Sequence, residues 1–402
     1  MKVIPANLLV ALFFLSKAQA FSSSPRRFVR STTTSLNLES LEQKTPGEKE
    51  VSFLLDTYGE KARFYRRDVF SASDWIQSRR SNRFIETLLS TNKSALLRQL
   101  SIELFFITII CSFIVAYNVI LIDGYTDLSG VKHDALANFL PALQLPMTPF
   151  TLTTSSLGLL LSFRTNVSYK RWNEARTAWG KVINDSRSIA RMGAIWSKSY
   201  KSIDEAGLQR LGEAICSFSR TLMNRTLPPL EDEKNFNIYT YERLTDQAYA
   251  DVLRTAKHRP TAALAEITSI LVDFQLNPLH QVEVEKVVTG LCDALGASER
   301  IFTSPVPTFY TRHTARFLAF FLLFLPMGLY EPMAGSWNHI AVLPVTILVG
   351  GFLLGIEELA TQMEEPFSIL PMEKMCEGSI RTAVMEQIQR SKDGIQAPYY
   401  GE

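Results

Sequence analysis

The segment from Leu157 to Gly180 joins two kinds of sequence in one continuous run. Its beginning, up to Phe163, is almost entirely apolar, and the remainder is dense in arginine, lysine and tryptophan. A helix that passes without a break from apolar to basic and aromatic residues fits the boundary between a bilayer and water, where such residues collect. The segment therefore predicts a helix that leaves a membrane and continues into an aqueous compartment.

The distribution of apolar residues, rather than their average, indicates a membrane protein. The 402 residues are 46% hydrophobic and 20% charged, and a net charge of +2 gives no reason to expect nucleic-acid binding. Buried helices of a soluble protein would explain one or two apolar runs, but four runs edged by charge predict four transmembrane helices. These are Leu104–Ile122, Leu143–Phe163, Phe317–Tyr330 with an extension from Thr311, and Ile340–Ile356.

An even number of spans places both mature termini on the same side as the long central segment, Asn173 to about Pro307. The start of that segment is basic, whereas the opposite connection, Asp123–Asp134, holds three acids and one lysine. The basic side is therefore predicted to be the cis side. Apolar residues recur at helical spacing in the central segment, and Pro228-Pro229, Arg259-Pro260 and Asn277-Pro278 mark turns. The predicted helical stripes are Ala175–Met192, Leu208–Leu222, Tyr241–Thr255, Ala262–Leu276 and Val282–Leu295.

Neither strand-like alternation, an internal repeat nor a nucleotide-binding motif is found in the sequence. The fold class is therefore predicted as all-α, with membrane helices that continue into a helical bundle. Metalloprotease, serine-hydrolase and P-loop motifs are also missing, and the five histidines are not paired at metal spacing. We expect no enzyme activity, no catalytic residues, no cofactor and no metal site.

Five spaced motifs combine polar or charged pairs with neighbouring apolar residues. They are Leu157–Gly180, Glu299–Ile301, Ser304–His313, Glu357–Ala360 and Glu364–Phe367. Together they resemble the signature of the bestrophin-like anion channels, in their plant and algal thylakoid branch. The resemblance covers roughly Ser78 to Gln389 and implies a homo-oligomer, usually a pentamer, whose second spans line an axial pore. It further implies passive conduction of chloride or bicarbonate, with membrane lipids around the assembly.

The second span carries the predicted pore neck. Ser155, Leu159 and Phe163 are four residues apart, so they share one helix face, and the resemblance places the neck of the family on the same face. An apolar ring gates by excluding water, and the positive edge of a phenylalanine ring tolerates an anion better than a cation. The acid-free run between Asp134 and Glu174 argues against a cation pore. The alternative is that this hydroxyl-rich helix only packs closely against neighbours.

Two departures from the family pattern and a predicted lower aperture also follow from the resemblance. Ser155 stands where the family usually has a larger apolar residue, which would make the neck wetter and admit hydrated anions such as bicarbonate. The resemblance places the lower aperture at Val306, between Pro305 and Pro307, although a Pro-X-Pro unit can also simply end one helix and start the next. The acidic cluster that holds calcium in animal members is replaced by Ser368–Pro371, so calcium activation of that kind is not expected.

Arg164 and Arg171 follow the neck. They can concentrate anions in a vestibule, but basic residues beside a membrane more often set topology or form ion pairs. The carboxylates expected as their partners are Glu174, Glu299, Glu357 and Glu358.

The N-terminus reads as a targeting sequence, because residues 1–38 contain no aspartate or glutamate. A basic start, an apolar run and Ala18-Gln19-Ala20 predict a signal peptide at 1–20, and Phe21 with the following Ser/Thr/Arg-rich stretch predicts a plastid transit peptide at 21–45. This order resembles the bipartite presequence of algae with secondary plastids, and the thylakoid membrane is the expected destination. An amphipathic stromal segment is expected at 46–95, the channel domain at 96–389 and a tail at 390–402.

An ordinary secreted protein with a disordered start is the alternative to plastid targeting. The four cysteines argue against it, because Cys111, Cys216, Cys292 and Cys376 show no disulfide framework spacing.

Two alternatives to a passive channel also stay open. An ion-coupled carrier would need a titratable group within the membrane and usually an internal repeat, and a membrane scaffold would carry no current.

Overall fold

The computed structural model describes residues 63, 67–90, 94–137, 139–227 and 229–392. The predicted signal peptide, the transit peptide, much of the segment 46–95 and all but the start of the tail lie outside these residues. The chain divides into two compact units. The described part of the first unit lies within Ser90–Phe163 and Phe309–Glu358, and that of the second lies within Asp56–Leu89, Arg164–Thr308 and Leu359–Glu402.

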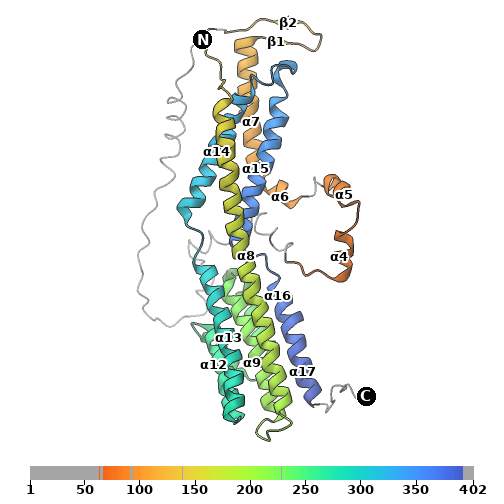
Figure 1. The fold of residues 1–402 in the computed structure, drawn as a ribbon, viewed down its shortest axis with the longest axis vertical. Coiled ribbons are helices and arrows are strands. Elements are labelled where there is room, and N and C mark those ends of the chain that lie inside the picture. The colour runs from red at the N-terminus through yellow and green to blue at the C-terminus, as the bar shows by residue number, and fades with distance from the viewer. Residues whose placement is uncertain (1–62, 64–66, 91–93, 138, 228, 393–402) are drawn as a thin grey trace, which may run out of the picture. The chain divides into compact units, whose positions relative to one another are not determined.

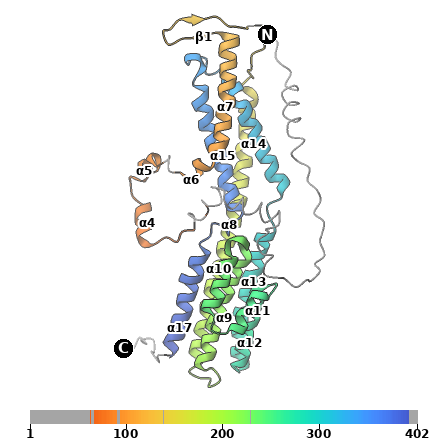
Figure 2. The same cartoon turned by 180° about the vertical axis from the view of Figure 1, so that it is seen from behind.

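Three helices form the core of the first unit, and they lie side by side in both views (Figures 1 and 2). They are α7 (Ser101–Tyr117), α14 (Thr308–Leu329) and α15 (Val342–Glu364), joined by the first part of α8 (Thr148–Trp196). The core contains Leu157 and Leu161 from α8, Leu318 and Phe321 from α14, and Cys111 from α7. The remaining elements are α6 (Ala95–Gln99), the π-helix η3 (Asn118–Asp123), the short strands β1 (Tyr125–Thr126) and β2 (Lys132–His133), and the 3-10 helix η4 (Trp337–His339).

A close helix contact in this core depends on Gly328. A Cβ added there would lie 2.7 Å from Cδ2 and Cε2 of Phe150, whose buried ring packs edge-to-face on Phe321. We expect Gly328→Ala to lower the free energy of unfolding by about 1–3 kcal/mol, the usual cost of overpacking a core. Thermal unfolding in detergent measures this loss. Gly296→Ala is the control, because its Cβ would meet nothing within 4 Å, and an unchanged Gly328→Ala melting temperature would contradict the prediction.

The second unit is a helical bundle built around α9 (Glu205–Thr226), of which most residues are buried. The second part of α8 contributes the fully buried Trp179, and Phe218 of α9 and Phe236 of α10 join the same core. The surrounding helices are α10 (Pro229–Arg243), α11 (Gln247–Thr255), α12 (Arg259–Asp273), α13 (Pro278–Thr303) and α17 (Thr382–Lys392). Shorter elements are α4 (Ala72–Ser78), α5 (Arg83–Leu89), α16 (Met372–Lys374) and the π-helix η5 (Met375–Arg381).

The structure confirms several sequence predictions and corrects others. The continuous helix through Leu157–Gly180 is confirmed as part of α8, and all four cysteines are free. The prediction of an all-α fold did not include one short hairpin, in which β1 and β2 pair antiparallel with Tyr125 opposite His133. The sequence reading also missed α10.

Only two helical runs in the described residues are long and apolar enough to cross a membrane on these criteria, Ser101–Asp123 and Trp337–Glu364. These contain the predicted first and fourth spans. Most of the predicted second and third spans lies in α8 and α14, although α8 begins at Thr148 and not at Leu143. Hydroxyl residues make α8 less apolar, and Arg312, His313 and Arg316 do the same for α14.

Candidate functional site

The three predicted neck residues lie along one exposed stripe of α8. Leu159 is 56% exposed and Phe163 is 55% exposed, and Ser155 is exposed as well. Leu157 and Leu161 lie on the opposite face of the helix and are only 1% and 2% exposed. The chain thus buries one face of α8 in its own core and leaves the predicted neck face exposed.

The hydroxyl groups of this helix fall into two classes. Thr151, Thr153 and Thr154 donate to carbonyl oxygens of their own helix, at 2.8, 2.8 and 2.6 Å, so they are satisfied locally. In contrast, the hydroxyls of Ser155 and Ser162 have no hydrogen-bond partner among the described residues, and both side chains are exposed. These serines can hydrogen-bond water or an anion without breaking an existing contact.

The first cation after the neck, Arg164, is turned inward. It is 5% exposed, its Nη2 donates to Thr361 Oγ1 at 3.0 Å, and the same atom lies 3.9 Å from Glu364 Oε2. Glu364 is not among the four carboxylates that the sequence suggested as partners. Its position makes Arg164 part of the packing between α8 and the end of α15.

Arg171 bridges two helix ends through main-chain oxygens. Its Nη2 donates to Ile301 O at 2.7 Å and its Nη1 to Ser304 O at 2.7 Å, at the end of α13. Its Nε donates to Glu364 O at 2.9 Å, at the end of α15. Carbonyl groups at a helix C-terminus are unsatisfied and carry the negative end of the helix dipole, so a guanidinium is a favourable cap there.

The expectation that Arg171 pairs with a carboxylate was therefore wrong. Two of the carboxylates proposed as partners bind other cations: Glu174 pairs with Arg300, and Glu299 accepts from Arg225 Nε and contacts His258 Nε2, both at 2.9 Å. Burial raises the pKa of Glu299, but the hydrogen bonds from Arg225 and His258 outweigh burial and hold the pKa below its ordinary value.

The predicted aperture residue Val306 lies in the short connection between α13 and α14. Its side chain is only 9% exposed, unlike those of Leu159 and Phe163, while Pro305 and Pro307 beside it are exposed. Helix α14 begins at Thr308, directly after Pro307. Since Arg171 binds the carbonyls of Ile301 and Ser304, it also fixes the segment that carries Val306.

Two arginines from the N-terminal part of the described chain contact the segment that replaces the acidic cluster of the animal members. Arg63 Nη1 donates to Glu365 Oε2 at 2.8 Å and also donates to the Ser368 hydroxyl. Arg67 Nε donates to Ser368 O at 2.7 Å. A guanidinium thus neutralises Glu365 directly. Nothing in the sequence pattern marked Arg63 or Arg67 for this contact.

Comparison with known proteins gives consistent matches along most of the chain. A family model described as "Bacterial/Fungal Bestrophin protein" matches residues 74–386. The Arabidopsis thaliana protein "Voltage-dependent chloride channel 2, chloroplastic" is 29% identical over 313 residues, which are 77% of this chain and 71% of that protein. Its relative "Voltage-dependent chloride channel 1, chloroplastic" is 27% identical over 342 residues, 84% of this chain and 77% of that protein.

Bacterial proteins match as well. A voltage-dependent anion channel-forming protein of a Nostoc species is 28% identical over 240 residues, 58% of this chain and 74% of that protein. A crystal structure of a bacterial bestrophin homologue from Klebsiella pneumoniae aligns with a TM-score of 0.57 at 20% identity. The alignment covers 72% of this chain and 99% of that one, and at this identity it supports the shared fold.

Proposed function

Because this chain belongs to the bestrophin family, we propose that it is a passive anion channel whose α8 helices line an axial pore in a homo-oligomer, a pentamer by analogy with the family. The observation that carries the proposal is the exposed stripe of Ser155, Leu159 and Phe163. A large apolar surface on a helix needs a partner or a specific role, and a ring of symmetric copies around an axis would give each stripe the same environment.

The chemistry of the stripe favours anions. No carboxylate lies between Asp134 and Glu174, so the helix cannot present an acidic ring to a cation. Rings of Leu159 and Phe163 would form a constriction that closes by dewetting, and phenylalanine edges carry the positive part of the ring quadrupole. A ring of Ser155 hydroxyls before this constriction would hydrogen-bond a hydrated anion, which makes bicarbonate a candidate beside chloride.

Four spans per subunit remain part of the proposal. The first and fourth are apolar enough to span a membrane by themselves. The helices α8 and α14 are less apolar, as helices that face a pore and neighbouring subunits would be, because they need not contact lipid all round. The acid-free leader and the chloroplastic relatives support a plastid membrane, and we propose the thylakoid, with the second unit in the stroma.

Val306 and the two arginines have different roles in this proposal. The segment that carries Val306 is the proposed lower aperture, and Arg171 holds the carbonyls of that segment in place. Arg164 is buried and ion-paired, so we assign it to packing more than to attraction of anions in a vestibule.

The two alternatives to a channel predict different transport. An ion-coupled carrier needs a titratable group inside the membrane, and Glu103 is the one acid in the apolar run of α7. A scaffold carries no current at all. The family and its named relatives are channels, which favours conduction over both alternatives and over an enzyme.

Selectivity gives the direct test. Purified protein in a planar bilayer is expected to show a reversal potential that follows the chloride gradient, and the bicarbonate gradient when bicarbonate replaces chloride, because the pore wall holds no acid. The measurement is repeated with a potassium gradient at equal chloride as the control. A reversal potential that follows potassium would refute the anion channel, and transport that saturates and requires a second ion would identify a carrier.

A further inference from the structure

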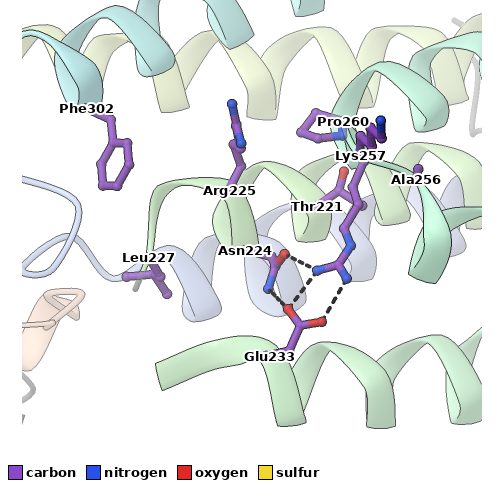
Figure 3. Close-up of a pocket in the computed structure, with 10 residues that line it drawn as sticks. Thr221, Asn224, Arg225, Leu227, Glu233, Ala256, Lys257, Pro260 and Phe302 are labelled. Atoms are coloured by element: carbon purple, nitrogen blue, oxygen red, sulfur yellow. Dashed lines mark hydrogen bonds and ion pairs between the residues drawn. The ribbon is translucent and has the colours of Figure 1, made fainter. Parts of the chain in front are cut away.

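The second unit contains a cavity of about 350 Å³ that the proposed pore does not use. It lies between the end of α9, the first part of α10, the start of α12 and the end of α13 (Figure 3). Its volume is at the lower end of the range for small-molecule sites, about 300–1,000 Å³. The charged side chains that line it are Arg225, Glu233, Lys257 and Arg259, so cations outnumber acids by three to one.

One of these cations, Arg259, uses its Nη groups in hydrogen bonds to other residues of the protein. Arg259 Nη1 donates to Glu233 Oε2 and to Asn224 Oδ1, both at 2.7 Å, and Nη2 donates to Glu233 Oε1 at 2.8 Å. The hydrogen bond from Arg259 is the main cause that lowers the pKa of Glu233. Since this bidentate pair neutralises the only acid in the lining, the charged lining residues that remain are Arg225, which pairs with Glu299 behind the wall, and Lys257.

The other two cations, Arg225 and Lys257, keep N–H groups that donate no hydrogen bond to the described residues. Arg225 uses Nε to bind Glu299, and within the described chain its two Nη groups have no hydrogen-bond partner. The Lys257 ammonium likewise has no ion-pair or hydrogen-bond partner among the described residues. Figure 3 shows both side chains well apart from the Glu233 carboxylate. Paired Nη donors match the geometry of a phosphate or carboxylate, and an ammonium adds a point charge.

Apolar groups complete the wall. Leu227, Pro260 and the ring of Phe302 line the cavity, and Phe302 is 43% exposed. Pro260 lies in the first turn of α12, a helix of 15 residues whose N-terminal dipole favours a nearby anion. The cavity therefore offers two cations and an aromatic surface on its wall, and Figure 3 shows Arg225 between Phe302 and Lys257.

We propose that this cavity binds a small organic phosphate, with the phosphate dianion held by Arg225 and Lys257 and the organic part against Phe302. Arg225 stays paired with Glu299 through Nε, so it offers the phosphate its Nη donors, while Lys257 adds an ammonium charge. A phosphate, with several acceptor oxygens, uses both kinds of donor better than a chloride does. If the chain is a channel, occupancy would also act on the aperture, because Glu299 and Phe302 belong to the last turns of α13, which leads to Val306. That second step rests on the proposed function, whereas binding does not.

Calorimetric titration of the full chain in detergent, at fixed chloride and ionic strength, tests the binding. The probes are phenyl phosphate and inorganic phosphate. We expect Arg225→Gln and Lys257→Gln each to weaken phenyl phosphate binding about tenfold, the effect of losing one charge-assisted hydrogen bond. Phe302→Ala is expected to weaken phenyl phosphate binding and to leave inorganic phosphate binding unchanged.

Arg210→Gln is the matched control. Arg210 is on the same helix, its side chain is 47% exposed against 46% for Arg225, and it pairs with Glu266 at 2.9 Å outside the cavity. Absence of phenyl phosphate binding, or equal weakening in Arg210→Gln and the cavity variants, would overturn the proposed site. Bilayer current of the same preparation is a separate readout: a protein that conducts without binding refutes only this site, and one that binds without conducting refutes only the channel.

Discussion

Replacing Phe163 by alanine is expected to raise the anion current of the reconstituted protein. In the proposed pore, the barrier at the neck arises from dewetting of the rings formed by Leu159 and Phe163, so it depends on the size and polarity of these side chains. Alanine widens the ring and lets water in. An increase on the order of tenfold would correspond to a barrier lowered by about 1.4 kcal/mol, and single-channel recording separates conductance from open probability.

The control removes a phenylalanine of similar exposure from another helix. Phe105 on α7 is 62% exposed against 55% for Phe163, and it is not part of the proposed pore. Phe105→Ala is therefore expected to leave the current unchanged if assembly and membrane yield are normal. Loss of current in Phe163→Ala, with assembly intact, would mean that this side chain holds the fold and does not line the pore.

A substitution of Ser155, the first neck residue, tests the proposed pore face independently of Phe163. Ser155 is exposed and its hydroxyl has no partner in the described residues, so it is free to hydrogen-bond a passing hydrated anion. Ser155→Leu is expected to reduce the bicarbonate current more than the chloride current, because bicarbonate is the larger anion and a hydrogen-bond donor. Equal loss for both anions would remove Ser155 from any role in selectivity.

The sequence predicted most clearly those features that depend on local chemistry. Proline at the start of a helix has the required φ and no hydrogen-bond donor to lose. The turns predicted at Pro260 and Pro278 accordingly coincide with the starts of α12 and α13, and α14 begins directly after Pro307. Helical spacing likewise placed Ser155, Leu159 and Phe163 on one face of α8, and the structure shows all three exposed.

Features that depend on weak or non-local signals were harder to predict. Helix α10 is polar, with no strong apolar stripe, and the stripe expected to begin at Tyr241 is interrupted where Asp246 caps α11 by accepting from Ala248 N and Tyr249 N. The β1–β2 hairpin has only two residues per strand, too few for an alternating pattern to be recognised.

The partners of Arg171 show the limit of reasoning from charge. A sequence lists carboxylates but gives no sign that three carbonyl oxygens from two helix ends will meet around one guanidinium. The prediction of an ion pair assumed that the guanidinium of Arg171 would bind a carboxylate. Unsatisfied carbonyl groups at helix ends also accept hydrogen bonds from a guanidinium. The segment Ile301–Ser304 and the main chain of Glu364 could be identified only from the structure.

This geometry predicts that Arg171→Gln destabilises the second unit and alters permeation together. Hydrogen bonds to a charged group contribute about 1.5–3 kcal/mol each, and partial exposure reduces the effect, so we expect a loss of about 3 kcal/mol in the free energy of unfolding. Without the cap, the carbonyls of Ile301 and Ser304 are released and the Val306 segment is less fixed. Thermal unfolding and the relative permeability of anions of different size measure the two effects.

Arg171→Lys distinguishes positioning from simple attraction of anions. Lysine keeps the positive charge but cannot present a rigid fork to three oxygens, so Arg171→Lys should resemble Arg171→Gln if Arg171 holds the helix ends. If the charge itself attracts anions, Arg171→Lys should conduct normally, and Lys170→Gln should reduce the current because it removes an exposed charge from the adjacent position. Normal stability and permeation in Arg171→Lys would therefore show that the three carbonyl contacts do not hold the aperture segment in place.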